Sequence, residues 1–248
     1  MSAPRDVLLG SFGAALAAAD PLRIVPRHLP PPPGGRTLVV GAGKAAAAMA
    51  AAVEAGWPEA APLEGLVITR YGHGAATRRI RVVEAGHPVP DEAGEAAARD
   101  ILALARALGE DDLLLVLVSG GGSSLLSLPV EGIPMADPKA VTRELFASGG
   151  PVQDMSTVRK HLSAIQGGRL ALATRARVVA LVISDVTGDD PTHIASGPCS
   201  PDPTTHGDAL AILDGWGVRP PPSVAAHLAR GAAGAIPETP KPGDPGFD

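Results

Sequence analysis

The sequence has few aromatic residues and almost no cysteine, and each scarcity excludes a class of protein. Phe, Trp and Tyr together make up 2% of the 248 residues. The chain therefore lacks the aromatic platforms on which single-stranded nucleic acids stack. One cysteine, Cys199, excludes an intrachain disulfide and fits a reducing compartment. We expect a cytoplasmic protein without a nucleic-acid partner.

An excess of basic charge and long apolar runs are also lacking. The formal net charge is -5, with 21 Lys and Arg residues spread along the chain, which argues against a nucleic-acid-binding surface. No apolar run reaches the roughly 18 residues of a membrane-spanning helix. The N-terminus faintly resembles a signal peptide, but Asp6 breaks the charge pattern, and residues 2–19 fit a capped amphipathic helix better. We expect no membrane partner.

Apolar residues are plentiful, at 45% of the chain, and they alternate between strand-like and helix-like patterns. We expect strands at residues 37–40, 65–69, 80–84, 113–118 and 177–183. Helices are expected at 45–53, 91–108, from 123, after 137 with Pro138 at its first position, and at 156–165, with Asp91 capping the second. This alternation predicts an α/β fold with a mainly parallel sheet covered on both faces, and functional loops at the carboxyl ends of its strands.

A glycine-rich loop follows the most apolar strand. The run from residue 113 leads into one serine, three glycines and two further serines: Ser119, Gly120, Gly121, Gly122, Ser123 and Ser124. Adjacent glycines let backbone N–H groups approach an anion, and a helix starting at Ser123 or Ser124 would point its positive end there. The loop therefore indicates a phosphate site, while an ordinary turn between strand and helix is the alternative.

The first strand is followed by Gly41-Ala42-Gly43-Lys44, which partly fits the dinucleotide-binding fingerprint. The acidic residue expected after the second strand is absent, and Arg70 there would suit only an NADP-type phosphate. Lysine is rare here, at four residues against seventeen arginines, so Lys44 at a helix start suggests a compact ammonium that holds a phosphate. A solvated lysine is the alternative.

A second polar segment follows the strand at 177–183. Asp185 comes directly after the strand and Asp189 and Asp190 a turn later, which predicts a hard-oxygen site for Mg²⁺ carrying a nucleotide phosphate. Ser196 and Gly197 could add donors to an anion. A plain polar turn is the alternative interpretation.

Two further groups could bind an anionic substrate. Arg159, Lys160 and His161 lie on the expected helix 156–165 away from its apolar face and could clamp a carboxylate or phosphate. His87 follows a short strand and could face the same cleft. The alternatives are a solvated basic face and a turn locked by two prolines.

Five segments in order resemble one family: GAGKA, EAGHPVPDE, SGGGSSLL, STVRKHLSAIQGGRLA and SDVTGDDPTHIASGP. They are similar to the class II glycerate kinases, also called glycerate 2-kinases, some of which are labelled hydroxypyruvate reductases. The resemblance covers nearly all of the chain. It implies a Rossmann-like three-layer N-terminal domain, here residues 1–234, without the smaller C-terminal α/β domain of the family. Residues 235–248, rich in Pro and Gly, then predict a linker or an unanchored tail.

The resemblance also implies an activity, namely phosphorylation of D-glycerate at its 2-hydroxyl by ATP with a divalent metal, in a cleft between two domains. By this resemblance Lys44 is tied to catalysis and the loop 120–124 contacts phosphate or substrate. The roles of Asp185 and Asp190 as metal ligands, of Asp189 in catalysis, and of the basic residues in substrate binding rest on the residues themselves. Gly41, Gly43, Ser119, Ser196 and Gly197 complete the expected phosphate site.

The sequence departs from the family pattern at four positions. Ser156 stands where Asn is common, Gln166 where Lys is, Thr187 where Pro is and Cys199 where Thr is. Without a second domain, turnover by this chain alone is not implied. Two rivals stay open: an NADPH-dependent hydroxypyruvate reductase, and a non-catalytic domain that binds carboxylates or phosphates. A homodimer is also left open.

Overall fold

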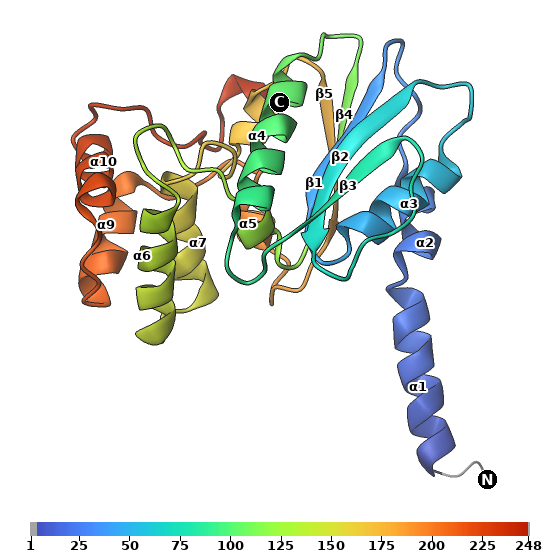
Figure 1. Ribbon diagram of the computed structural model, residues 1–248, viewed down its shortest axis with the longest axis horizontal. Coiled ribbons are helices and arrows are strands. Elements are labelled where there is room, and N and C mark those ends of the chain that lie inside the picture. The colour runs from blue at the N-terminus through green and yellow to red at the C-terminus, as the bar shows by residue number, and fades with distance from the viewer. Residues whose placement is uncertain (1–3, 248) are drawn as a thin grey trace.

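The computed structural model describes residues 4–247, and its centre is one five-stranded sheet (Figure 1). The strands are β1 (Thr37–Ala42), β2 (Leu63–Arg70), β3 (Ile80–Ala85), β4 (Leu113–Ser119) and β5 (Arg177–Ile183). They lie in the order β3-β2-β1-β4-β5, and every neighbouring pair is parallel. The predicted α/β fold is confirmed, and the sheet is wholly rather than mainly parallel.

Helices cover both faces of the sheet, which is why its central strands can be continuously apolar. All seven residues of β4 are buried. On one face, α4 (Glu92–Arg106) packs against alternate residues such as Leu38 and Leu114. On the other, α3 (Ala46–Gly56), α2 (Pro21–Ile24) and a 3₁₀ turn, η1 (Val25–His28), cover residues such as Val39. As predicted, Asp91 caps α4, accepting the Gly94 N–H at 3.0 Å.

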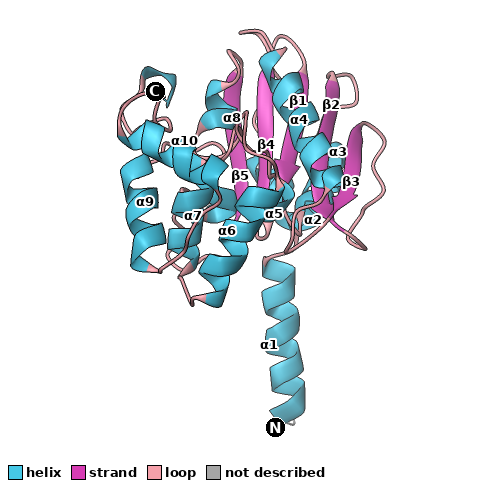
Figure 2. Cartoon of the chain, turned by 60° about the vertical axis from the view of Figure 1, so that its left-hand side comes forward, coloured by secondary structure: helices cyan, strands magenta, loops and turns pink. Residues whose placement is uncertain are grey.

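Four helices form a third apolar core beside the sheet, next to β5 (Figure 2). They are α6 (Ala136–Ala147), α7 (Val152–His161), α9 (His206–Gly215) and α10 (Pro222–Ala232). Helix α6 begins one residue before Asp137, which therefore lies inside its first turn. Helix α7 begins four residues before the predicted start at Ser156 and ends four residues before Ile165. Strand–helix alternation does not predict this cluster, because its helices come as two successive pairs, α6 with α7 before β5 and α9 with α10 after it.

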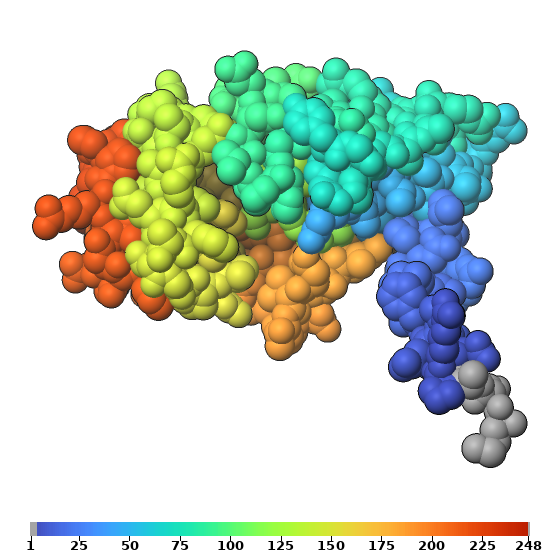
Figure 3. Space-filling model, turned by 60° about the horizontal axis from the view of Figure 1, so that its bottom comes forward, coloured from blue at the N-terminus to red at the C-terminus, as the bar shows by residue number. Residues whose placement is uncertain are grey.

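The N-terminal helix α1 (Pro4–Ala18) projects from the body (Figures 1 and 3). The predicted helix is confirmed over these residues, and its expected cap at Ser2 lies outside the described ones. None of its residues is buried, and Leu8 and Phe12 are 71% and 63% exposed. No single helix among the described residues is long and apolar enough to cross a membrane. Only α1 together with Pro21–His28, bent by 51°, meets the criteria of length and composition.

The segment after residue 235 packs onto the body. Thr239 is buried, Pro240 accepts the Asp202 N–H at 2.7 Å, and Lys241 Nζ donates to Thr239 Oγ1 at 2.8 Å. An unanchored terminus is therefore wrong for these residues, although the sequence there has no apolar periodicity. The domain boundary at 234/235 stays a prediction.

Candidate functional site

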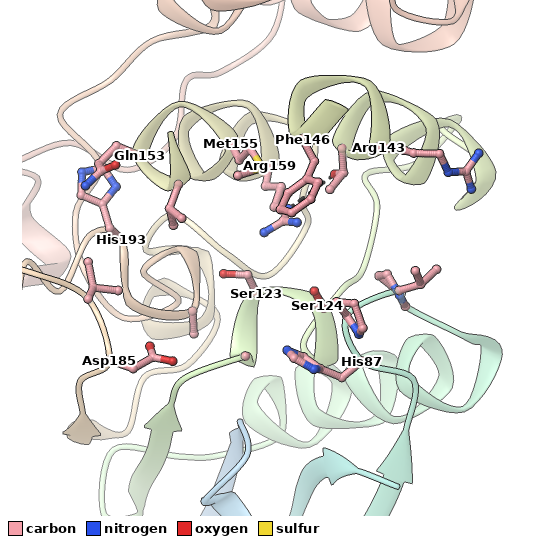
Figure 4. A pocket seen from close by; sticks show the side chains of 18 of the residues that line it. His87, Ser123, Ser124, Arg143, Phe146, Gln153, Met155, Arg159, Asp185 and His193 are labelled. Atoms are coloured by element: carbon pink, nitrogen blue, oxygen red, sulfur yellow. Dashed lines mark hydrogen bonds between the residues drawn. The ribbon is translucent and has the colours of Figure 1, made fainter. Parts of the chain in front are cut away.

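A pocket of about 600 Å³ lies where the carboxyl ends of the strands face α6 and α7 (Figure 4). Seen from that edge, the surface is hollowed, with α6 and α7 on one side of the hollow and the segment after β5 on the other (Figure 3). The pocket brings together several predicted residues from loops after β3, β4 and β5 and from α7: His87, Gly121, Ser123, Ser124, Arg159 and Asp185. The prediction that functional loops gather at this edge is met by the geometry.

The glycines after β4 leave room for side chains from other loops. A Cβ atom on Gly120 would lie 1.8 Å from Asp185 Oδ2. One on Gly121, whose φ is +85°, would lie 2.8 Å from His87 Nε2 and 3.4 Å from Lys44 Cγ. The carboxylate, the imidazole and the lysine stem therefore converge on two adjacent residues of this loop.

Helix α5 (Gly122–Leu125), which follows these glycines, has only four residues. It begins at Gly122, one residue before the predicted start, and its dipole is correspondingly small. Within residues 4–247 the Gly121 N–H makes no hydrogen bond, and this residue lies on the pocket wall. The loop thus offers a backbone donor, in agreement with the expected anion site.

Lys44 and Asp185 form an ion pair at the edge of the pocket. Lys44 Nζ lies 3.2 Å from Asp185 Oδ2, and the two side chains are 45% and 49% exposed. Such a solvated pair contributes little to stability. Both groups can therefore be recruited by a ligand, the ammonium by a phosphate and the carboxylate by a cation.

The environment of His87 favours its neutral form. Burial lowers the pKa of its imidazole, and the charges of Lys44, Arg70 and Arg159 lower it further against the opposing effect of Asp185. A neutral imidazole on the pocket wall can accept a proton.

Arg159 reaches into the pocket from α7, on the wall opposite Ser123 (Figure 4). Its guanidinium is partly buried, and desolvation lowers its pKa, though not enough to remove the charge of an arginine. Its side-chain hydrogen bond within residues 4–247 is a long one, from Nε to Thr142 Oγ1 at 3.5 Å, and no carboxylate lies within 4 Å. A desolvated cation without a counter-charge is unfavourable, so an anion in this pocket would be bound favourably.

Lys160 and His161 do not line the pocket, which corrects their predicted role as substrate ligands. Lys160 Nζ pairs with Asp202 Oδ1 at 2.8 Å, and both side chains are 0% exposed. The buried His161 ring places Nδ1 2.8 Å from the Thr157 carbonyl oxygen. Consecutive residues of a helix point in different directions, so only Arg159 of the predicted basic cluster faces the pocket.

The buried cluster around Lys160 contains groups that sequence analysis did not identify. Three side chains have potential ligand atoms within 4.8 Å of one another: His161, His206 and Glu238. Both nearby carboxylates already face an ammonium. Asp202 pairs with Lys160, and Glu238 Oε2 lies 3.5 Å from Lys241 Nζ. A divalent cation would leave buried positive charge uncompensated, so this donor set fits a structural ion-pair network better than a metal centre. The one local signal for Glu238 was an acidic residue in an otherwise Pro-rich stretch.

Asp189 and Asp190 lie off the pocket wall. Asp190 Oδ1 accepts the N–H of Thr192 at 2.8 Å and its hydroxyl at 2.7 Å. Asp189 is exposed, with a φ of 53°. The polar-turn alternative fits both residues, and it corrects their predicted roles as base and metal ligand, because Asp185 alone of the three acids reaches the pocket.

Gly41 and Gly43 serve strand packing rather than ligand binding. A Cβ atom on Gly41 would lie 2.0 Å from the Leu117 carbonyl oxygen, and one on Gly43 would lie 2.1 Å from Ser119 Oγ. Both glycines and Ser119 are buried. Their predicted role in phosphate binding is corrected accordingly.

The backbone donors at the start of α3 are also occupied. The Ala45 N–H donates to Ser119 Oγ at 3.0 Å, and the Lys44 N–H donates to the Gly120 carbonyl at 2.8 Å. A dinucleotide fold needs these donors for the pyrophosphate. The NADPH interpretation of the GAGKA segment therefore loses its structural basis.

Ser196 and Gly197 are buried and do not line the pocket, which corrects the prediction that they contact phosphate directly. Ser196 reaches the pocket through Ser123, with 2.9 Å between the two hydroxyl oxygens. The pocket wall also contains residues of α6 and α7 that the sequence did not single out: Lys139, Thr142, Arg143, Phe146 and Met155. No motif marks them, because they converge only when the two helices pack.

The family model described as a domain of unknown function, DUF4147, matches residues 7–229. A protein of Agrobacterium vitis named "Putative hydroxypyruvate reductase" is 53% identical over 97% of this chain and 54% of its own length. The glycerate 2-kinase of Pyrococcus horikoshii is 39% identical over 95% of this chain and 56% of its own length.

Two solved structures share the fold. A crystal structure of a Pyrococcus horikoshii protein matches with a TM-score of 0.87 and 38% identity, over 100% of this chain and 60% of that one. A glycerate kinase from Thermotoga maritima matches with a TM-score of 0.80 and 39% identity, over 93% and 54%. The chain thus spans about half the length of the curated relatives it matches. It belongs to the DUF4147 family, the N-terminal domain of the glycerate 2-kinase family.

Proposed function

We propose that the pocket binds D-glycerate and MgATP and supports phosphoryl transfer to the 2-hydroxyl of glycerate. The observation that carries this proposal is the desolvated Arg159 guanidinium, which has no acidic partner among residues 4–247 and faces the glycine loop across the pocket. A small carboxylate such as glycerate supplies the missing counter-charge in a bidentate pair. The names of the kinase relatives support the same substrate.

Phosphoryl transfer depends mainly on positioning and on neutralising the phosphoryl oxygens. Lys44 supplies a compact positive charge beside the loop, and the Gly121 N–H adds a backbone donor. Asp185 is the carboxylate that would hold Mg²⁺. This donor set fits, since Mg²⁺ is usually bound through one or two carboxylates plus substrate phosphates. The bound cation would neutralise phosphate charge.

The reacting hydroxyl must lose a proton, and His87 is suited to accept it. Burial and the charges of Lys44, Arg70 and Arg159 lower its pKa below the ordinary value, which favours the neutral imidazole. It lies against Gly121, next to the Lys44 stem. General-base catalysis requires the base to lie within hydrogen-bond reach of the proton that it removes, so the 2-hydroxyl of glycerate would have to lie beside His87.

Replacement of Arg159 tests the proposal. Arg159→Met should raise the KM for D-glycerate by about 10- to 100-fold, the worth of a hydrogen bond to a charged group. Arg159→Lys should recover only part of the loss, because an ammonium cannot bind a carboxylate in a bidentate manner. Arg81→Met, which removes an exposed arginine paired with Asp100, is the control and should leave the KM unchanged. The readout is 2-phosphoglycerate formation, first by this chain and then by a version extended to the full length of the relatives.

Three results would contradict parts of the proposal. Oxidation of NADPH by hydroxypyruvate, without dependence on MgATP, would favour the reductase named among the relatives. Anion binding without turnover in both lengths of the protein would favour the non-catalytic domain. An unchanged KM in Arg159→Met would remove the assigned role of this residue.

A further inference from the structure

Three consecutive residues behind the pocket wall form a left-handed turn. Ala195, Ser196 and Gly197 have φ values of 52°, 57° and 58°. Glycine adopts this conformation readily, whereas alanine and serine do so at a cost in conformational energy. Two adjacent non-glycine residues in this region persist only where the surrounding structure determines them strongly, and such strain tends to lie at functional sites.

Backbone hydrogen bonds hold the turn in place. The Gly167 N–H donates to the Ser196 carbonyl at 2.9 Å, and the Gly168 N–H donates to the Gly197 carbonyl at 2.7 Å. Gly167 and Gly168 are themselves left-handed, with φ values of 60° and 83°. Two left-handed segments are thus joined backbone to backbone, and Ser196 between them is 0% exposed.

The Ser196 hydroxyl has a single hydrogen-bond partner among residues 4–247, the Ser123 hydroxyl at 2.9 Å. A serine has one proton to donate, and leaving it unpaired in the interior is costly. Ser196 therefore donates to Ser123 Oγ. Ser123 lies on the pocket wall and has no acceptor of its own among these residues. Its proton is consequently available to an acceptor in the pocket, whose opposite wall carries Arg159 (Figure 4).

We infer that Ser196 is a positioning residue that makes Ser123 a hydroxyl donor to an anionic oxygen bound opposite Arg159. The inference rests on the proposed function in one respect, the binding of an anionic substrate in this pocket. The anionic oxygen belongs either to a carboxylate or to a phosphoryl group. In both cases the strain at Ala195 and Ser196 serves to aim a buried hydroxyl at the wall of the site.

The test uses two variants that remove the same hydroxyl but differ in backbone strain. Ser196→Gly relieves the left-handed conformation and Ser196→Ala retains it, so Ser196→Gly should unfold at the higher temperature of the two. Both should lose about fivefold in affinity for the anion, the worth of one neutral hydrogen bond. Calorimetric titrations with inorganic phosphate and with D-glycerate, run separately, show which anionic group Ser123 serves.

A double-mutant cycle completes the experiment. Ser123→Ala should lose a similar factor, and adding Ser196→Ala to it should cost no further affinity, because Ser196 acts through Ser123. The inference would be overturned if the affinity losses of Ser123→Ala and Ser196→Ala were additive. It would also be overturned if affinity followed stability, so that Ser196→Gly bound the anion as tightly as the parent. Binding of neither anion by the parent would overturn it as well. If the affinity losses are non-additive as expected but no phosphorylation is detected, the proposed kinase function is contradicted and this inference is still supported.

Discussion

Glycine is required after β4 because other side chains occupy the space where its Cβ atoms would be. Asp185 lies against Gly120, and His87 lies against Gly121. The sequence motif by itself indicates a way for an anion to approach the backbone. The structure adds a second reason, namely that three chemically active side chains approach the same backbone. Gly120 and Gly121 therefore each leave the space that a functional side chain occupies.

A matched pair of glycine variants separates strain from crowding. Gly121 and Gly132 have the same φ of +85°, but a Cβ atom on Gly132 would have no neighbour within 4 Å. We expect Gly132→Ala to lose about 1–2 kcal/mol of unfolding free energy and to keep the affinity for D-glycerate. Gly121→Ala should lose more stability and weaken D-glycerate binding, because His87 must move. Equal affinities in the two variants, measured by calorimetry beside urea unfolding, would contradict this account.

Among the elements, α7 has two functional sides. Arg159 faces the pocket, while Lys160 and His161 join α7 to α9, α10 and the segment at 238–241. Helix α10 accommodates this arrangement through Gly231, where a Cβ atom would lie 2.2 Å from Cγ of His206. The His161 and His206 rings pack edge to face at 4.8 Å. The orientation of Arg159 is therefore held by a buried polar network one residue away.

This network predicts a dependence of stability on pH. Burial, against the opposing charges of Asp202 and Glu238, lowers the pKa of His161 below its ordinary value of 6.5. The unfolded chain then binds a proton that the folded chain does not, so stability present at neutral pH is lost as pH falls below about 6.5. One such group changes the unfolding free energy by at most about 1.4 kcal/mol per pH unit.

Urea unfolding between pH 5 and 8 measures this effect. His161→Gln should show a shallower dependence than the parent, whatever its absolute stability. His73→Gln removes an exposed histidine and should keep the parental slope. A parent that is more stable at pH 5 than at pH 7 would show that the sign is wrong.

At the scale of the whole molecule, the two ends of the described chain differ in how they are held. Helix α1 has no buried residue, whereas Glu238 accepts the His206 N–H at 3.0 Å and Thr239 is buried. The C-terminal segment therefore contributes to the body, and the N-terminal helix does not. The sequence suggests the reverse, since residues 4–18 are apolar and the segment after 235 is rich in Pro and Gly.

Two truncations test this contrast. Removal of residues 1–18 should leave the unfolding temperature within about 2 °C of the parent, because little burial is lost. Removal of residues 236–248 should lower it by about 5–10 °C, because Asp202 and His206 lose buried hydrogen-bond partners. Differential scanning calorimetry of both truncations decides the matter. A larger loss from the N-terminal deletion would show that α1 packs on the body in solution.

Local patterns in the sequence determined the strands, the capped helix after Asp91 and the parallel α/β class, because these depend on apolar periodicity and on residues close in the chain. They also located the loops of the pocket, since parallel strands end at one edge. Tertiary packing alone decided which of Arg159, Lys160 and His161 faces the pocket and that Ser196 supports Ser123, 73 residues away. The physical reason is that a polar side chain acquires its role from partners distant in sequence, and no local pattern specifies where they will lie.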